Sequence, residues 1–176
     1  MPPPMPVVAT VALLLAPGQA PPAPVTDAVV SEIVVDAPVE VVWDAYTDPE
    51  SMRAWQVPRV SPFELRIGAR WRTSYDASAS LGDDDPTVIE NEVLAFDPGR
   101  MLAVRTVKAP ADFPFPSAIL DVWMVLYLEP VDSSRTRVVT RMFGFTAGEE
   151  SQAMRAFFER GNAYELGKLA EHLSGR

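Results

Sequence analysis

The chain has 176 residues, of which 48% are hydrophobic and 22% are charged, a composition typical of one globular domain with a substantial core. It contains no cysteine, which excludes disulfides, catalytic thiolates and thiolate zinc sites. The net charge of -9 predicts no nucleic-acid partner, because nucleic acids bind cationic surfaces.

Residues 1–25 differ in composition from the rest of the chain. Eight of the first 24 residues are proline, which neither continues a helix nor donates to a sheet. Residues 7–16 form an apolar run that is too short to span a bilayer but has the length of a signal-peptide core. No Lys or Arg precedes this run, and Pro21 follows the candidate cleavage site at Ala20. We expect a disordered proline-rich tail or a signal peptide, without a membrane span. A periplasmic or secreted location and a cytoplasmic one both stay open.

The predicted domain, residues 28–173, begins with a strand and two short helices. β-Branched residues predict the strand at 28–36. Proline is favoured in the first turn of a helix, so the first helix is expected at 38–47. Asp48 is the expected N-cap of a second helix at 49–55.

The middle of the chain alternates between apolar and polar residues, which is the pattern of antiparallel strands with one buried face. Strands are predicted at residues 69–78, 87–96, 101–108, 119–128 and 135–145. Asp97-Pro98-Gly99-Arg100 has the composition of a β-turn. Residues 129–134 are expected to turn a hairpin between the last two strands.

The last predicted element is a helix at 149–173 that contains no proline. Its apolar residues recur at helical spacing, so one broad face must be buried against the sheet. Gly161 and Gly167 each cost about 1 kcal/mol relative to alanine inside a helix, which indicates either a cavity beside the helix or close packing against a strand. The order of elements predicts an α+β domain in which a curved antiparallel sheet wraps around this helix.

Three segments resemble a known family. Residues 33–50 (IVVDAPVEVVWDAYTDPE) are similar to the opening of START-like helix-grip (SRPBCC) domains. Residues 128–130 (LEP) and 157–162 (FFERGN) are most similar to the bacterial branch homologous to the activator of the heat-shock-protein-90 ATPase. The resemblance covers residues 28–173 and implies a deep apolar cavity between the sheet and the last helix. Polyketide cyclases and lipid-transfer proteins are distant relatives, so the resemblance does not assign one activity.

The inward-facing residues of the strands and of the last helix are the candidate lining of this cavity. The candidate ligand-binding residues are Trp55, Trp71, Tyr75, Ile89, Asn91, Met124, Leu126, Met142, Met154, Phe158, Gly161 and Glu165. Asn91 and Glu165 are polar, and a polar group in an apolar cavity needs a partner, a water or a ligand. The favoured interpretation places Glu165 at the cavity mouth, in water. If Glu165 were buried, its pKa would rise and it could act as an acid.

No residue is assigned to catalysis, and no metal or cofactor is expected. The one histidine, His172, lies in the last turn of the last helix, where a cation suits the helix dipole. The sequence has no phosphate-binding glycine loop and no metal-ligand spacing. We expect a carrier, sensor or sequestering protein for a small apolar or amphipathic molecule. The alternatives are a cyclase- or hydrolase-like enzyme that uses polar groups of the cavity, and a protein-interaction module related to co-chaperone domains.

The outer face of the sheet carries aromatic and basic residues. Trp123 and Tyr127 share one face of their strand, and Arg137, Arg141 and Phe143 share a face of the next strand. Stacked cation–π pairs explain this composition. A homodimer contact through the outer sheet face is the alternative explanation.

Overall fold

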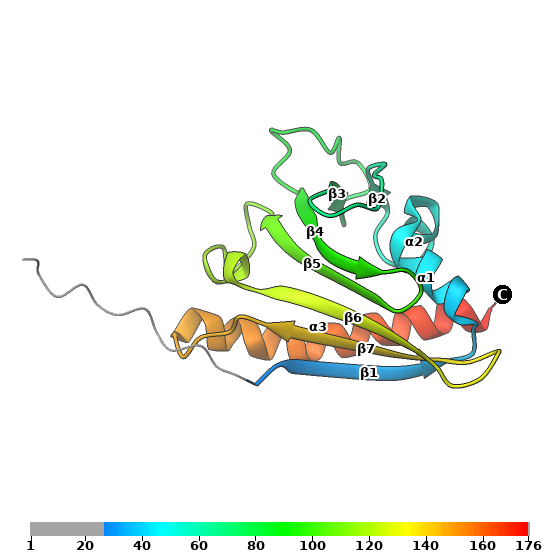
Figure 1. Ribbon diagram of the computed structural model, residues 1–176. Helices are drawn as coiled ribbons and strands as arrows, with labels where there is room; N and C mark the ends of the chain where they lie inside the picture. Colours follow the sequence, from blue (N-terminus) through cyan, green and yellow to red (C-terminus); the bar gives the residue numbers. More distant parts are fainter. Residues whose placement is uncertain (1–26, 176) are drawn as a thin grey trace, which may run out of the picture.

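The computed structural model describes residues 27–175, which fold around one antiparallel sheet (Figure 1). The predictions for residues 1–25 lie outside the described residues. The elements in chain order are β1 (Val29–Val35), α1 (Val39–Thr47), α2 (Pro49–Trp55), β2 (Arg59–Val60), β3 (Arg70–Ser74), β4 (Ile89–Asp97), β5 (Met101–Lys108), the 3-10 helix η1 (Ala118–Asp121), β6 (Trp123–Pro130), β7 (Thr136–Phe143) and α3 (Glu149–Ser174). Within this part of the chain, the seven strands pair in the order β1-β7-β6-β5-β4-β3-β2, and every pair is antiparallel.

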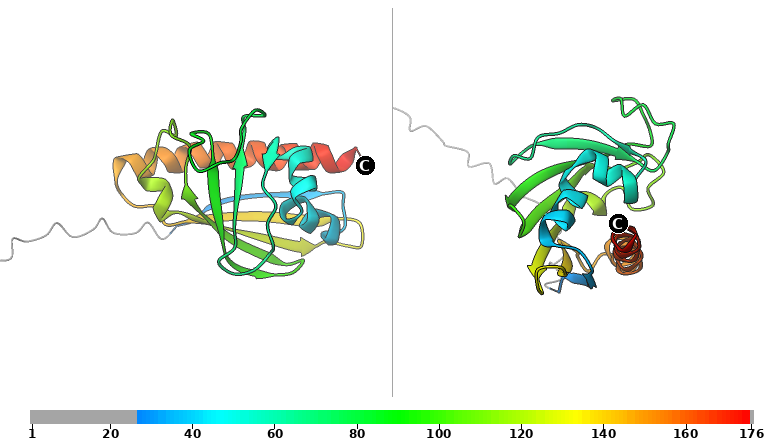
Figure 2. Two further views of the ribbon diagram at one scale, coloured as in Figure 1. Left: turned by 90° about the horizontal axis from the view of Figure 1, so that it is seen from above. Right: turned by 90° about the vertical axis from the view of Figure 1, so that its right-hand side faces the viewer.

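The long helix α3 lies inside the curve of the sheet, which confirms the predicted α+β class, the curved antiparallel sheet and the two short helices after the first strand. Figure 2 shows α3 end-on with the sheet bending around it. The backbone of α3 comes closest to β1, η1 and α2. The inner face of β3 to β5 stays farther from the helix, and this wider part of the interior holds a cavity.

Strand β4 gives the sheet much of its curvature. Its pairing with β5 shifts in register between Glu90 and Asn91 and again between Val93 and Ala95. Such bulges bend a strand and increase its twist. The part of the sheet formed by β2, β3 and β4 therefore curls out of the plane of β1, β7 and β6, as Figure 2 shows.

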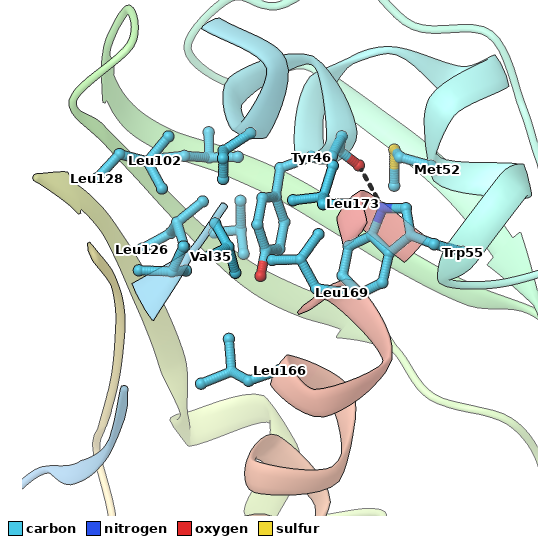
Figure 3. Close-up of a cluster of buried hydrophobic side chains, with 14 of the residues drawn as sticks. Val35, Tyr46, Met52, Trp55, Leu102, Leu126, Leu128, Leu166, Leu169 and Leu173 are labelled. Carbon is cyan, nitrogen blue, oxygen red and sulfur yellow. Dashed lines mark hydrogen bonds between the residues drawn. The ribbon is translucent and has the colours of Figure 1, made fainter. Parts of the chain in front are cut away.

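The two short helices close one end of the domain. Asp48 caps α2, because its Oδ2 accepts a hydrogen bond from the backbone N–H of Ser51 at 2.7 Å. Trp55, at the end of α2, donates from Nε1 to the carbonyl of Ala45 at 2.8 Å (Figure 3). The residue four positions after Ala45 is Pro49, which has no N–H. The indole of Trp55 therefore satisfies a carbonyl that α1 itself leaves unpaired.

The hydrophobic core has two clusters. The larger cluster joins α1 and α2 to the sheet and to the C-terminal half of α3, with Tyr46 and Leu169 near its centre (Figure 3). The smaller cluster surrounds Phe145 and includes Met154 from the N-terminal half of α3. Residues 158–165 of α3 lie between the two clusters, and this stretch borders the cavity.

Strand β3 is shorter than predicted, and a neighbouring strand was not predicted. β3 ends at Ser74 instead of continuing to residue 78. The chain turns there because the Asp76 carboxylate accepts hydrogen bonds from the backbone N–H and the hydroxyl of Ser78. The two-residue strand β2 pairs with β3 at the sheet edge, and two residues are too few for a periodic sequence signal.

The segment before β6 and the end of β7 also differ from the prediction, for one shared reason. Residues 118–121 form η1 instead of the start of a strand, and β7 ends at Phe143. Gly144 follows with a φ of +94°, and a Cβ at this position would lie 2.0 Å from the carbonyl oxygen of Asp121. Only glycine permits this conformation and this close approach of two backbones, so Gly144 both ends β7 and fixes η1 beside it.

Candidate functional site

A cavity lies between the inner face of the sheet and α3. It consists of three compartments of about 330, 170 and 130 Å³. Tyr75 and Ile89 line both the first and the second compartment. Asn91, Met124 and Glu165 line both the second and the third. Because they share lining residues, the compartments are direct neighbours.

The largest compartment, here named the phenylalanine compartment, is almost wholly apolar. Its walls are Tyr75, Ile89, Thr106, Ala109, Pro110, Phe113, Ile119, Phe157 and Phe158. Phe157 stands edge-on to Phe113 and to Phe158, with ring centroids 6.1 and 5.3 Å apart. Phe157 is 41% exposed and Tyr75 is 65% exposed, so the mouth of the cavity lies here, between α3 and the end of β3.

The second compartment, named the tryptophan compartment, borders α1 and α2. Its walls are Tyr46, Met52, Gln56, Val57, Trp71, Thr73, Tyr75, Ile89, Asn91, Leu102, Val104, Met124 and Glu165. Trp71 is 6% exposed, and its ring stacks on Phe63 with centroids 4.8 Å apart. Within residues 27–175, Trp71 Nε1 is the one buried side-chain nitrogen or oxygen without a hydrogen-bond partner. A buried donor without an acceptor costs about 1–3 kcal/mol, which makes this N–H unusual in a folded protein.

The third compartment, named the methionine compartment, has polar groups that bond to one another. Its walls are Asn91, Val104, Arg105, Thr106, Ile119, Val122, Trp123, Met124, Met142, Phe158, Asn162 and Glu165. Asn162 Nδ2 donates to Met142 Sδ at 3.2 Å, and Thr106 Oγ1 donates to Asn91 Oδ1 at 3.2 Å. These bonds hold both amide side chains in place against an otherwise apolar wall.

Strand pairing explains why the lining side chains from different strands meet. Trp71 on β3 pairs with Asn91 on β4, which pairs in turn with Thr106 on β5. Met124 on β6 pairs with Met142 on β7. Residues that are paired across strands share a face of the sheet. Alternation along each strand therefore fixes which residues reach the cavity.

Glu165 extends from α3 to the walls of the tryptophan and methionine compartments. Its Oε1 accepts a hydrogen bond from Gln56 Nε2 at 3.1 Å, and Lys168 Nζ donates to the Gln56 carbonyl at 3.3 Å. Burial raises the pKa of Glu165, and the Gln56 bond and the Lys168 charge oppose this rise without cancelling it. The residue as a whole is only partly buried. Glu165 is thus a partly buried carboxyl on the cavity wall, and its placement at the cavity mouth, in water, stays a prediction.

A tyrosine shares this environment. Tyr46 lines the tryptophan compartment from α1 and is itself buried. Burial raises the pKa of Tyr46, and the charge of Glu165 raises it further. Tyr46 therefore stays protonated at neutral pH and presents a neutral hydroxyl beside the carboxyl.

The twelve predicted site residues fall into two groups, with Gly161 as an exception. Eight of the twelve lie on the cavity walls: Trp71, Tyr75, Ile89, Asn91, Met124, Met142, Phe158 and Glu165. Trp55, Leu126 and Met154 lie in the packed core, at 5%, 0% and 0% exposure. Gly161 lines none of the three compartments, but it shares a helix face with Phe158 and Glu165. A Cβ at Gly161 would have no atom within 4 Å, so the space beside it is open.

Several lining residues were not among the sequence candidates, and Tyr46, Gln56, Thr106, Phe113 and Asn162 are examples. Asn162 carried a usable signal, because it lies four residues after Phe158 on the same helix face. Thr106 did as well, by alternation along its strand. Gln56 and Phe113 lie in segments without periodicity, where the sequence gives no indication of direction.

A groove of about 850 Å³ lies between α1 and the turn from β4 to β5. Trp43 and Tyr127 are its aromatic members. Unlike the inner cavity, it contains no buried polar atom without a partner. Nothing in this groove requires a ligand, so the inner cavity is the candidate site.

The outer face of the sheet contains the aromatic and basic pairs that the sequence indicated. Trp123 stacks on Phe143 with ring centroids 5.6 Å apart. The guanidinium of Arg141 lies over the ring of Tyr127, 5.8 Å from its centroid. The predicted cation–π pairing is therefore present on this face.

The described residues were also examined for metal-binding groups and for membrane-spanning helices. Within residues 27–175, no three His, Cys, Asp or Glu side chains are grouped in a way that could hold a metal ion. In the same part of the chain, no helix has both the length and the apolar character needed to cross a membrane.

Comparison with known families agrees with the fold. Residues 26–174 match the family model described as polyketide cyclase / dehydrase and lipid transport. The chain belongs to this family. The predicted membership of the START-like helix-grip superfamily is thereby confirmed. A search of curated proteins found no match.

Solved structures share the fold of this cyclase and lipid-transport family member. Protein MLL2253 from Mesorhizobium loti is 24% identical at a TM-score of 0.63, with 84% of this chain and 97% of that chain covered. The Aha1 dimer from Colwellia psychrerythraea is 14% identical at 0.64, with 84% and 96% covered. DynU16, from the dynemicin biosynthetic locus, is 20% identical at 0.62, with 84% and 47% covered. At these identities the similarity shows the fold alone.

Proposed function

We propose that this protein binds a small apolar or amphipathic molecule in the cavity between the sheet and α3, as a carrier, sensor or sequestering protein. The observation that carries the proposal is the cavity itself, with apolar walls and a few polar groups. Ligand sites in proteins have this composition and typically occupy several hundred Å³. The largest compartment, of about 330 Å³, falls in that range, and compartments of about 170 and 130 Å³ adjoin it.

The position of the mouth also supports binding. The exposed rings of Phe157 and Tyr75 line the largest compartment, so an apolar molecule meets aromatic surface before it reaches the interior. Unbranched and aromatic side chains such as Met124, Met142 and Phe158 line the inner walls. Methionine adapts to irregular shapes, so this lining suits ligands of different outline.

The test is a titration with the neutral fluorescent probe N-phenyl-1-naphthylamine. Ile89 lines both the phenylalanine and the tryptophan compartment, so Ile89→Trp should fill part of each. Gly161→Leu should obstruct the space beside α3. Val34→Trp is the matched control, because Val34 is 49% exposed on the outer face of β1.

The parent and Val34→Trp should bind the probe with equal affinity, and Ile89→Trp should bind it at least about tenfold more weakly. Circular dichroism and the thermal midpoint of each variant establish that it is folded. Equal binding by the parent and Ile89→Trp, or no binding by the folded parent, would contradict the proposal.

A second candidate function is catalysis, and Glu165 favours it. A carboxyl whose pKa is raised by burial is suited to act as a general acid. The family description also names cyclases and dehydrases. Mass spectrometry of the parent and of Glu165→Gln, both purified from the native host, separates the two functions. A binding protein retains the same molecule in both forms, whereas an enzyme retains product in the parent and unconverted substrate in the variant.

We also propose the outer sheet face as a contact between two copies of the chain. Trp123 and Tyr127 are 40% and 37% exposed there, next to the partly exposed Phe143. The Aha1 protein from Colwellia psychrerythraea is described as a dimer. Sedimentation velocity of the parent and of Tyr127→Glu tests the contact: the parent should sediment as a dimer and the variant as a monomer. A monomeric parent would exclude it.

A further inference from the structure

A small recess adjoins the tryptophan and methionine compartments beside α3. Its volume of about 20 Å³ is enough for one water molecule. Five of its seven lining residues are polar: Tyr46, Gln56, Thr140, Asn162 and Glu165. None of the seven is an exposed residue, and none lines the phenylalanine compartment. This space, here named the polar recess, therefore concentrates hydrogen-bonding groups at one place in an otherwise apolar interior.

The hydroxyl of Tyr46 is a hydrogen-bonding group that the protein itself does not use. Tyr46 is 8% exposed, and its Oη has no hydrogen-bond partner within residues 27–175. In the same part of the chain, Trp71 Nε1 is the one side-chain nitrogen or oxygen that is both unpartnered and fully enclosed. The Tyr46 hydroxyl therefore keeps accessible surface. It points toward Leu166 of α3, which lines the polar recess (Figure 3).

The Glu165 carboxyl is the complementary group. Gln56 Nε2 donates to its Oε1 at 3.1 Å, and no donor of the described residues bonds to Oε2. Oε2 is not fully enclosed either, so it is available as an acceptor. Lys168 Nζ donates to the Gln56 carbonyl at 3.3 Å. Burial raises the pKa of Glu165, whereas the Gln56 bond and the Lys168 charge favour its ionised, accepting form.

Tyr46 and Glu165 together select the polar atom of a ligand. The neutral Tyr46 hydroxyl can donate, whereas an ionised carboxyl only accepts. A ligand hydroxyl can accept from Tyr46 and donate to Glu165 at the same time, but a carbonyl or ether oxygen has no proton for Glu165. An ammonium group could donate to Glu165, but it would be buried near the charge of Lys168, and burying a charge costs more than burying a hydroxyl.

We infer that the ligand is an alcohol or phenol whose hydroxyl occupies the polar recess between Tyr46 and Glu165 and whose apolar body lies in the tryptophan compartment. The recess and that compartment are direct neighbours, because both are lined by Tyr46, Gln56, Met124 and Glu165. The inference rests on the proposed binding function and adds a chemical class and an orientation to it.

Three ligands of similar size test the inference: 2-naphthylmethanol, 2-ethylnaphthalene and 2-naphthylmethylamine. They differ only in the terminal group, which is a hydroxyl, a methyl and, at pH 7, an ammonium. Equilibrium dialysis at pH 7, with the ligand measured by its ultraviolet absorbance, gives each affinity. The quantity compared between the parent and a variant is the ratio of the affinities for the alcohol and the hydrocarbon. In this comparison the difference in hydrophobicity between the two ligands cancels.

Two variants remove the two groups separately. Tyr46→Phe keeps the ring that packs edge-on against Trp55, with centroids 5.2 Å apart, and removes only the hydroxyl. Glu165→Met keeps an unbranched side chain and removes the acceptor. Each should lower the ratio about three- to tenfold, which is the contribution of one hydrogen bond. Tyr164→Phe is the matched control and should keep the ratio, because Tyr164 is 73% exposed on α3 and lines neither the recess nor the compartments.

Circular dichroism establishes that each variant is folded, and Tyr46→Phe alone decides the test if Glu165→Met is unfolded. An unchanged ratio in folded Tyr46→Phe or Glu165→Met, an equal fall in Tyr164→Phe, or tightest binding of the amine by the parent would each overturn the inference. Binding of N-phenyl-1-naphthylamine would still support the cavity in those cases. Failure of all three ligands to bind a protein that binds this probe would also overturn the inference, whereas failure of the probe itself would contradict the proposed function.

Discussion

Two tryptophans of equal burial differ in one hydrogen bond, and this difference predicts unequal effects of the same substitution. Trp55 is 5% exposed and Trp71 is 6% exposed. Trp55 Nε1 donates to the Ala45 carbonyl at 2.8 Å, whereas Trp71 Nε1 has no partner within residues 27–175. Replacement by phenylalanine removes the same atoms in each case, so the loss of packing is similar in the two variants.

The hydrogen-bond contributions have opposite signs. Trp55→Phe leaves the buried Ala45 carbonyl unpaired, which lowers the free energy of unfolding by about 1–3 kcal/mol beyond the packing loss. Trp71→Phe removes an unpaired donor and recovers a penalty of about the same size. Trp55→Phe should therefore destabilise the protein by at least about 2 kcal/mol more than Trp71→Phe. For a domain of this size that corresponds to a difference of about 4–8 °C in thermal midpoint.

Urea unfolding of the ligand-free proteins, followed by far-ultraviolet circular dichroism at 25 °C, measures this difference. The dependence of the free energy on urea should be the same in both variants, because each exposes the same surface on unfolding. Equal destabilisation, or a greater loss in Trp71→Phe, would refute the reasoning. It would mean that the Trp71 N–H has an acceptor in solution.

Three further predictions concern the carboxyl, a backbone contact and the N-terminus. Burial raises the pKa of Glu165 above 4.5, the ordinary carboxyl value, so the folded state loses stability as the pH rises above that value. Glu165→Gln should therefore have a higher thermal midpoint than the parent at neutral pH and the same midpoint near pH 4. Gly144→Ala should lower the free energy of unfolding, measured with urea, by more than about 2 kcal/mol, because the strain of a positive φ adds to the clash with Asp121. Gly99 has a φ of +70° but open space around it, so Gly99→Ala should lower the free energy of unfolding by about half as much. Deletion of residues 1–25 should leave the thermal midpoint unchanged in scanning calorimetry.

The sequence predicted the direction of lining residues on strands better than on any other element. Alternation placed Trp71, Ile89 and Asn91 on the inner face, and all three line the cavity. The strand period of two leaves little freedom once one face is buried, so a correct strand assignment fixes the direction of each side chain.

The sequence could not predict which inward-facing side chains line the cavity and which are packed in the core. Met124 and Leu126 share a strand face, yet Met124 lines the cavity and Leu126 is covered by Tyr46 and its neighbours in the larger cluster (Figure 3). Which of two equivalent positions is covered depends on elements far away in the chain. The same holds for Glu165, whose partner Gln56 is 109 residues away. Helical spacing gave the correct face of α3 but carried no information about that contact.

The two register shifts in β4 show that the backbone gives the cavity its shape, whereas side chains of other positions form its lining. The bend that opens the interior comes from the backbone of β4, at Glu90/Asn91 and Val93/Ala95. The residues that line the cavity, such as Ile89 and Thr106, contribute side chains to a space whose outline the main chain already determines. Replacement of those side chains can change which molecule fits while the topology stays the same. A chain of this architecture is therefore able to diverge in specificity by single substitutions, with no intermediate that has to fold differently.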